Sequence, residues 1–129
     1  MTILNPNSPA EADLIVNQAD DFYMVFTMAV SGGSVVDLTD DTFTCVVTDR
    51  LDADKTVLAT VDVATLVPSA GTFYVRIPTA TTAALTGFKT VNGGQRDVNC
   101  GYYDIYRTHD GFRKMVMYGK IILRRGAGA

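Results

Sequence analysis

The chain offers few side chains that could carry chemistry, and the first to consider is its one histidine. His109 stands beside Asp110, and an imidazole next to a carboxylate is part of a nucleophilic triad. Both residues fall at the tip of a predicted hairpin, where we expect neither an element that orients the ring nor a nearby nucleophile. We therefore predict that the chain is not an enzyme.

Two cysteines and an Asp-rich stretch are the other candidates. Cys45 and Cys100 lack CxxC spacing, and with one histidine they cannot supply the four ligands of a structural zinc site. Residues 37–41 could hold calcium through carboxylate oxygens, but without EF-hand spacing a solvated acidic turn is the preferred interpretation. No phosphate-binding or dinucleotide motif occurs. Paired carboxylates for glycoside hydrolysis stay open, although Glu11 is the only glutamate. We expect no catalytic residue, no metal and no cofactor.

Basic side chains gather toward the end of the chain. They are Arg107, Arg113, Lys114, Lys120, Arg124 and Arg125. Such cations neutralise phosphates, but the net charge of the chain is −3, so nucleic acid is not favoured. Exposed tyrosines beside arginines are typical of protein interfaces, which favours a protein partner. The candidate partner-binding residues are Ile3, Leu4, Pro6, Gln95, Arg96, Tyr106, Arg113, Tyr118, Arg124 and Arg125.

Charge is distributed unevenly along the 129 residues. Residues 11–62 hold eleven acidic side chains against Arg50 and Lys55, a balance of −9, whereas residues 63–129 have a balance of +6. This asymmetry would suit contacts between the acidic face of one copy and the basic face of another, although interleaved strands could also mix the charges. No stretch approaches the roughly 20 apolar residues of a membrane span, and the N-terminus lacks the pattern of a secretory signal. We expect assembly in a reducing cytoplasm, away from membranes.

Alternating apolar and polar residues predict strands through most of the chain. Runs at 101–108 and 113–123 flank Asp110-Gly111 and predict a β-hairpin. Five earlier runs, at 14–16, 22–30, 42–49, 57–63 and 73–77, bring the predicted strands to seven. One or two helical turns are expected within 78–85, with Thr79 as cap and Gly87 as stop. The fold class is therefore all-β, an Ig-like antiparallel β-sandwich in one domain.

The two ends and one insertion depart from this pattern. Residues 1–12 contain two prolines and two asparagines, so we expect an extended N-terminal arm rather than a strand. Residues 13–125 form the predicted sandwich, and residues 126–129 form a C-terminal tail. Ordered ends would indicate that neighbouring subunits hold them. Residues 87–99 are the most polar insertion, and such loops often carry function.

The two cysteines lie 55 residues apart, a separation that also suits the inter-sheet disulfide of an immunoglobulin domain. Cys45 shares a face with Phe43 and Val47. Cys100 has the opposite parity to Tyr103, an expected inward residue of its own strand. No tryptophan is present to pack on such a bridge. We therefore predict two reduced structural cysteines.

A series of short motifs occurs in an informative order. They are Gln18-Ala19-Asp20-Asp21-Phe22, Val35-Val36-Asp37-Leu38-Thr39, residues 43–50, Ala70-Gly71-Thr72-Phe73, Thr82-Ala83-Ala84-Leu85, Tyr103-Asp104-Ile105 and Gly119-Lys120-Ile121. Together they resemble the immunoglobulin-like domain of tailed-bacteriophage baseplate upper proteins, from about residue 13 to residue 124. The resemblance implies a noncatalytic structural subunit in the virion, in a tail, baseplate or adaptor, bound to other virion proteins and to copies of itself.

Two alternatives stay open. A capsid decoration protein belongs to the same structural class, but would show the copy number of the capsid lattice instead of tail symmetry. A carbohydrate-binding module belongs to another class and would use Tyr102, Tyr106 or Tyr118 as sugar platforms. The absence of tryptophan makes the carbohydrate module the less favoured of these interpretations.

Overall fold

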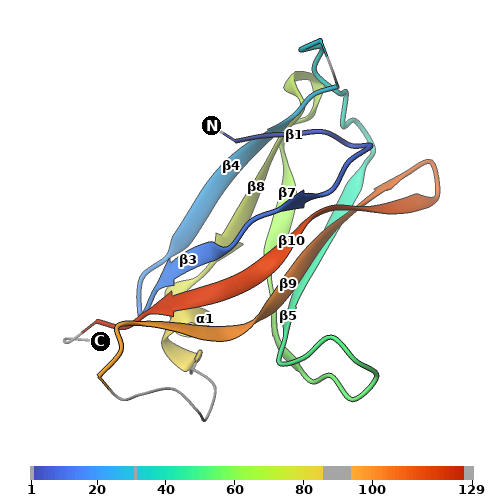
Figure 1. The fold of residues 1–129 in the computed structure, drawn as a ribbon. Helices are drawn as coiled ribbons and strands as arrows, with labels where there is room; N and C mark the ends of the chain where they lie inside the picture. Colours follow the sequence, from blue (N-terminus) through green and yellow to red (C-terminus); the bar gives the residue numbers. More distant parts are fainter. Residues whose placement is uncertain (1, 31, 86–93, 127–129) are drawn as a thin grey trace.

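The computed structural model describes residues 2–30, 32–85 and 94–126, and these residues form a β-sandwich (Figure 1). The strands are β1 (Thr2–Leu4), β2 (Ala10–Glu11), β3 (Leu14–Asn17), β4 (Phe22–Met28), β5 (Thr42–Thr48), β6 (Val57–Thr60), β7 (Asp62–Val67), β8 (Thr72–Ile77), β9 (Asp97–His109) and β10 (Phe112–Arg124). A 3-10 turn spans Pro68–Ala70, and a short helix, α1, spans Thr79–Ala84. The predicted all-β class is confirmed.

The strands form two sheets. One has the order β1-β4-β8-β7, and the other has the order β2-β10-β9-β5-β6, with β3 also paired to β10. In the lettering of immunoglobulin domains, the first order is A-B-E-D, and β10-β9-β5-β6 is G-F-C-C′. The predicted Ig-like sandwich is therefore the observed architecture.

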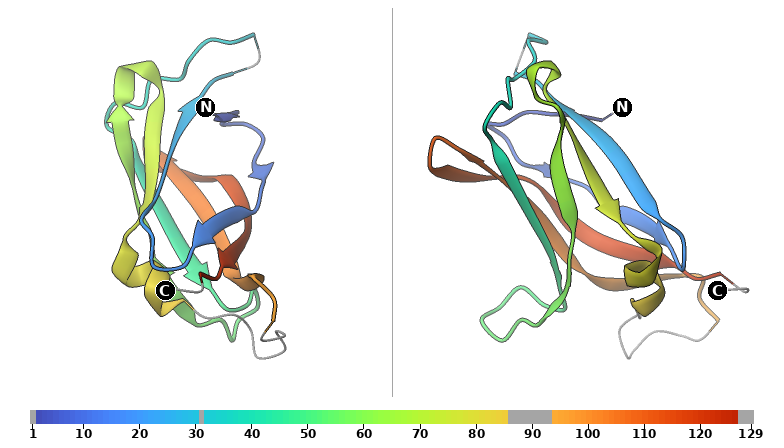
Figure 2. Two further views of the ribbon diagram at one scale, coloured as in Figure 1. Left: turned by 90° about the vertical axis from the view of Figure 1, so that its left-hand side faces the viewer. Right: turned by 180° about the vertical axis from the view of Figure 1, so that it is seen from behind.

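The sheets are mixed rather than wholly antiparallel, and the difference comes from residues 2–17, here called the N-terminal segment. Its β1 pairs in parallel with β4, and its β2 and β3 pair in parallel with β10. Figure 2 shows the segment passing from one sheet to the other along one side of the sandwich. The expected arm is thus partly strand. Proline and asparagine residues predicted a loop, but the open edges of both sheets supply backbone partners to the stretches around them.

The core lies between the sheets and contains an aromatic stack. Phe73 of the four-stranded sheet stacks on Phe26 of its own sheet at 5.4 Å and on Phe43 of the opposite sheet at 4.4 Å between ring centroids. Phe26 and Phe73 are fully buried, as the alternation of β4 and β8 predicted. The stack therefore joins the two sheets across the core.

Residues 57–63, predicted as one strand, belong to two. The chain leaves the six-stranded sheet after β6 and enters the four-stranded sheet as β7. Between them, Val61 is buried, and its amide donates to the carbonyl of Cys45 over 2.9 Å. The sequence does not reveal this change of sheet, because the inward-facing residues of β6 and β7 belong to one continuous alternation of apolar and polar residues.

Helix α1 begins differently from the prediction. Thr79 is its first helical residue and not its cap, and the helix follows Pro78 without a side-chain cap of its own. Instead, the backbone N–H and the hydroxyl of Thr79 both donate to Oδ1 of Asp21, at 2.8 and 2.9 Å. The predicted stop, Gly87, and residues 87–93 of the polar insertion lie outside the described residues.

The β9–β10 hairpin is confirmed, with His109 paired to Phe112 across Asp110-Gly111. Asp110 (φ 49°) and Gly111 (φ 80°) have the positive φ values of a tight two-residue turn. The ladder is interrupted between Ile121 and Ile122, where Cys100 is the extra residue of β9. This bulge reverses the parity of β9, so Cys100 also faces inward and the parity argument against pairing was wrong.

The conclusion about the cysteines nevertheless stands, because both are free and buried. Cys45 lies on β5 and Cys100 on the adjacent β9, within one sheet rather than across the sandwich. Burial raises the pKa of the Cys45 thiol to about 12 and that of the Cys100 thiol to about 11. Both therefore remain protonated at neutral pH and act as small core side chains.

Candidate functional site

The ten predicted partner-binding residues do not form one surface. Tyr106, Arg113 and Tyr118 lie on the β9–β10 hairpin, whereas Gln95, Arg96, Arg124 and Arg125 lie at the opposite end of these strands. Ile3, Leu4 and Pro6 belong to the N-terminal segment.

The outer face of the six-stranded sheet carries three parallel rows of side chains from β5, β9 and β10. In register, these rows are Thr44–Tyr106–Met115, Val46–Asp104–Tyr118 and Thr48–Tyr102–Lys120. We call the residues of these rows, together with Arg113 and Leu51, the tyrosine face. Its tyrosine side chains are all half-buried. Three tyrosines therefore stand in one continuous patch.

The tyrosine face is hollowed rather than flat. One hollow of about 460 Å³ is lined by Glu11, Asp13, Leu51, Tyr102, Tyr103, Asp104, Met115, Tyr118, Gly119 and Lys120. A second, of about 320 Å³, is lined by Val46, Thr48, Leu51, Lys55, Tyr102, Tyr103, Asp104, Tyr106 and Arg113. Tyr102, Asp104 and Leu51 line both, so the two hollows adjoin. Leu51 is 71% exposed at their common rim, where a partner would cover it.

Charged groups sit between the tyrosines. The Arg113 guanidinium lies 3.6 Å from the centre of the Tyr106 ring, a cation–π contact. Partial burial raises the pKa of the Asp104 carboxyl above its usual range, and it outweighs the opposing pull of Arg113 and Lys55. Asp104 is thus a partly desolvated carboxylate whose charge the chain itself does not fully compensate. Sequence reasoning did not single out Asp104 or Leu51.

The basic residues at the other end of the hairpin are occupied within the chain. Arg124 makes two hydrogen bonds of 2.9 Å to the carboxylate of Asp97, which hold the pKa of Asp97 below its usual range. Arg125 donates through Nε to the carbonyl of Gln95 over 2.8 Å, and Arg96 donates to the carbonyl of Arg125 over 3.0 Å. These contacts join the outer ends of β9 and β10, so we assign these residues a structural role.

The N-terminal candidates separate by burial. Leu4 is 1% exposed and packs in the core. Ile3 is 68% exposed on the edge strand β1. Pro6 lines a hollow of about 370 Å³ beside the hairpin, together with Arg107, His109 and Phe112. The alternation of so short a strand gave no indication of which neighbour, Ile3 or Leu4, faces the core.

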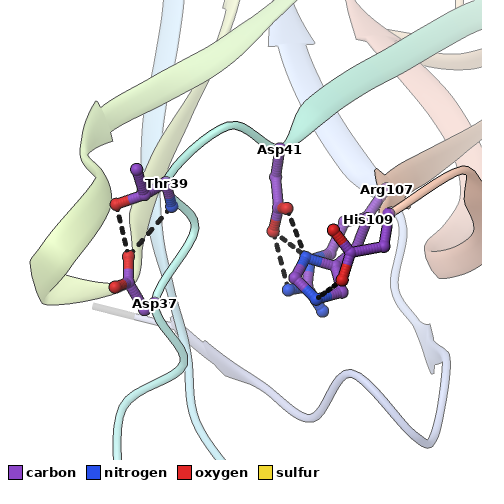
Figure 3. Close-up of polar contacts among 6 residues, drawn as sticks. Asp37, Thr39, Asp41, Arg107 and His109 are labelled. Carbon is purple, nitrogen blue, oxygen red and sulfur yellow. Dashed lines mark hydrogen bonds and ion pairs between the residues drawn. The ribbon is translucent and has the colours of Figure 1, made fainter.

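His109 has an orienting partner that the sequence did not reveal (Figure 3). Asp41, whose side chain is 1% exposed, lies 2.6 Å from His109 Nδ1 and accepts from Arg107 Nε over 2.7 Å. Nε2 of His109 lies 3.2 Å from a carboxylate oxygen of Asp110. The predicted absence of an orienting element is therefore wrong.

This cluster still does not form a triad. The described residues that line the adjacent hollow are Pro6, Asn7, Arg107, His109, Phe112, Lys114 and Val116, and they include no serine, cysteine or threonine. The ring nitrogen that would act on a nucleophile faces Asp110 instead. The cluster is best explained as a structural ion pair that ties the 39–41 turn to the hairpin.

Two of the three carboxylates in the acidic turn at residues 37–41 are bound within the chain. Asp37 accepts from the backbone N–H and the hydroxyl of Thr39, at 2.9 and 2.6 Å, and Asp41 is bound as described (Figure 3). Within residues 2–30, 32–85 and 94–126, no three His, Cys, Asp or Glu side chains are placed to share a metal ion. In the same part of the chain, no helix is long and apolar enough to cross a membrane.

Comparison with known proteins assigns neither a family nor a function to the chain. The sequence matches no protein-family model and no curated protein. The tyrosine face is therefore the candidate site on its geometry alone.

Proposed function

We propose that the chain is a noncatalytic structural subunit of a tailed-phage virion, in the tail, the baseplate or an adaptor, and that it binds other virion proteins through the tyrosine face. The observation that carries the proposal is the juxtaposition of Tyr102, Tyr106 and Tyr118 on one outer sheet surface. The resemblance of the colinear motifs to baseplate upper proteins supports the virion setting.

The composition of the face fits a protein partner. Tyrosine and arginine are enriched among the residues that dominate binding energy, and Tyr106, Tyr118 and Arg113 are of these types. Val46, Met115 and Leu51 supply apolar area around them, as in the centre of an interface. A basic side chain of the partner placed near Asp104 would compensate its partly desolvated carboxylate.

The test compares variants of one side chain on the two outer faces. Tyr118→Ala removes a central ring of the tyrosine face, and Tyr23→Ala removes a 54% exposed ring from the outer face of the four-stranded sheet. The amount of each variant is measured by mass spectrometry in particles purified from cells that produce the virus encoding the chain.

We expect Tyr118→Ala to reduce incorporation at least about tenfold, as expected of a hot-spot ring, while Tyr23→Ala is incorporated like the wild type. Equal incorporation of both variants would contradict binding through the tyrosine face. Absence of the wild-type chain from every particle would contradict the virion role itself.

One observation also favours a second candidate, a carbohydrate-binding module. Tyr102 and Tyr118 line the larger hollow together with carboxylates of Glu11, Asp13 and Asp104, and aromatic rings beside hydrogen-bonding groups suit sugars. Tyr106 suits this role less well, because Arg113 already covers its ring. Binding of the purified chain to a glycan array, lost in Tyr118→Ala and kept in Tyr23→Ala, would establish this alternative.

A further inference from the structure

We propose that the N-terminal segment, residues 2–17, is exchanged between two copies of the chain, so that each copy's segment fills the same place on its partner. The proposal concerns the chain alone and does not depend on the virion role. The proposed partner is a second copy of the chain. The interaction surface is the part of the two sheets on which the segment lies, here called its seat.

The seat is an edge of both sheets that the segment alone covers. Figures 1 and 2 show the segment lying along one side of the sandwich, beside β4 and β10 and connected to the rest only through the turn after β3. Its side chains Leu4, Leu14 and Val16 are at most 5% exposed and complete the core. The sandwich therefore needs a segment in this place, but not necessarily its own.

The segment makes specific contacts in the seat. Gly119 lets the backbone of Ala12 approach so closely that a Cβ at position 119 would clash with the Ala12 carbonyl oxygen. The Tyr103 hydroxyl donates to that oxygen over 2.6 Å. The backbone N–H of Lys120 donates to Asp13 over 3.1 Å. A second copy carries the same segment and can make every one of these contacts.

The connection to the rest of the chain is short and strained. Only residues 18–21 separate β3 from β4, and Ala19 among them has φ 63°. A left-handed backbone at a residue with a Cβ is unfavourable, and alanine has no polar side chain to offset it. Asp20 is tied back to Asn17 by a 3.2 Å hydrogen bond, which keeps the turn tight.

Opening this turn into an extended connection relieves the strain at Ala19 and sends the segment to another copy. Short hinges under strain favour such exchange, because the closed and exchanged forms share all contacts except those of the hinge. The exchanged form is a dimer, so its fraction increases with protein concentration during folding.

The first experiment alters the hinge of the full chain and measures mass by light scattering after refolding at high concentration. Ala19→Gly removes the strain of the closed turn, and we expect a smaller dimer fraction. Ala19→Pro cannot adopt a positive φ, and we expect it to be mostly dimeric. Asp40→Gly is the matched control, because it relieves a similar φ of 64° outside the hinge and leaves the dimer fraction unchanged.

The second experiment detects exchange directly and keeps the wild-type hinge, so it decides the matter even if Ala19→Pro fails to fold. Ile15 and Ile122 are register partners between β3 and β10. Copies with Ile15→Cys and copies with Ile122→Cys are mixed unfolded, refolded together and oxidised. Exchange gives a crosslinked dimer of the two variants.

A mixture of Ile15→Cys with Thr44→Cys is the control and gives no crosslink, because Thr44 lies on β5 and pairs with Tyr106 rather than with β3. Absence of a crosslink in the Ile15–Ile122 mixture at the highest soluble concentration would overturn the proposal. An equal change of dimer fraction in Ala19→Gly and Asp40→Gly would overturn the role of the hinge.

Discussion

Asp41 is a buried carboxylate that contacts two basic side chains. Its buried carboxylate accepts from Arg107, whose side chain is 12% exposed, and from His109. Removing one partner of a buried ion pair leaves the charge of the other uncompensated. This lowers the stability of the fold even where the intact pair contributes little to it.

We predict that Asp41→Asn lowers the free energy of unfolding by about 3 to 5 kcal/mol, the usual range for a broken buried pair. Urea denaturation measures this change. Asp110→Asn is the control, since the Asp110 side chain is 83% exposed, and we expect a change within about 0.5 kcal/mol. Equal effects of the two substitutions would contradict the structural role of Asp41.

We expect the carboxyl of Asp104 to make the stability of the folded chain depend on pH. Burial raises the pKa of its carboxyl in the folded chain, so folding favours the protonated form. The stability that Asp104 contributes is therefore greatest at low pH and is lost as pH rises through the unfolded and then the folded pKa.

Asp104→Asn imitates the protonated carboxyl, and we predict that it unfolds at a higher temperature than the wild type at pH 7. The advantage shrinks as pH falls, and it vanishes below both pKa values. Thermal unfolding of the two chains between pH 3 and pH 7 follows this difference. A constant difference over that range would show that the charge of Asp104 is not its cause.

Among the elements, the N-terminal segment departs furthest from what the sequence predicted. Alternation correctly located β3, β4, β5, β8 and the β9–β10 hairpin, because each has an apolar face of period two. β1 and β2 hold two or three residues each, too few for any period to appear. Bulges also shift parity without a sequence signal, as at Cys100.

Gly119 makes the pairing of this segment testable. A methyl group there meets backbone rather than a flexible side chain, so the segment must move away from β10. We predict that Gly119→Ala lowers stability by about 1 to 3 kcal/mol and speeds hydrogen exchange at Leu14 and Val16. Lys120→Ala, the neighbouring change at an exposed position, leaves exchange of these amides unchanged. Unaltered exchange in Gly119→Ala would contradict the close approach of Ala12.

At the scale of the whole molecule, the sequence predicted the class of the fold correctly and suggested part of the candidate site. Tyr106, Arg113 and Tyr118 were selected as residue types typical of interfaces, and the structure brings them onto one face. The contributions of Asp104 and Leu51 depend on strands and loops far apart in the chain. The grouping of Asp41 with Arg107 and His109 spans 66 to 68 residues, and no local pattern reports it.

The charge asymmetry along the sequence does not become a simple pair of opposite faces. Arg124 is paired with Asp97, and Arg107 with Asp41, so the cations of the second half are partly neutralised where they lie. The tyrosine face is instead a mixed surface of rings, apolar groups and the carboxylate of Asp104.

The central claim is that this chain is a structural part of a tailed-phage particle, and locating it on such particles tests the claim most directly. Gold-labelled antibodies against the purified chain are applied to particles from cells that produce the virus encoding it, and the labels are mapped by electron microscopy. We predict label at the tail or baseplate. Label over the capsid shell would establish a decoration protein instead, and particles without label would contradict the claim.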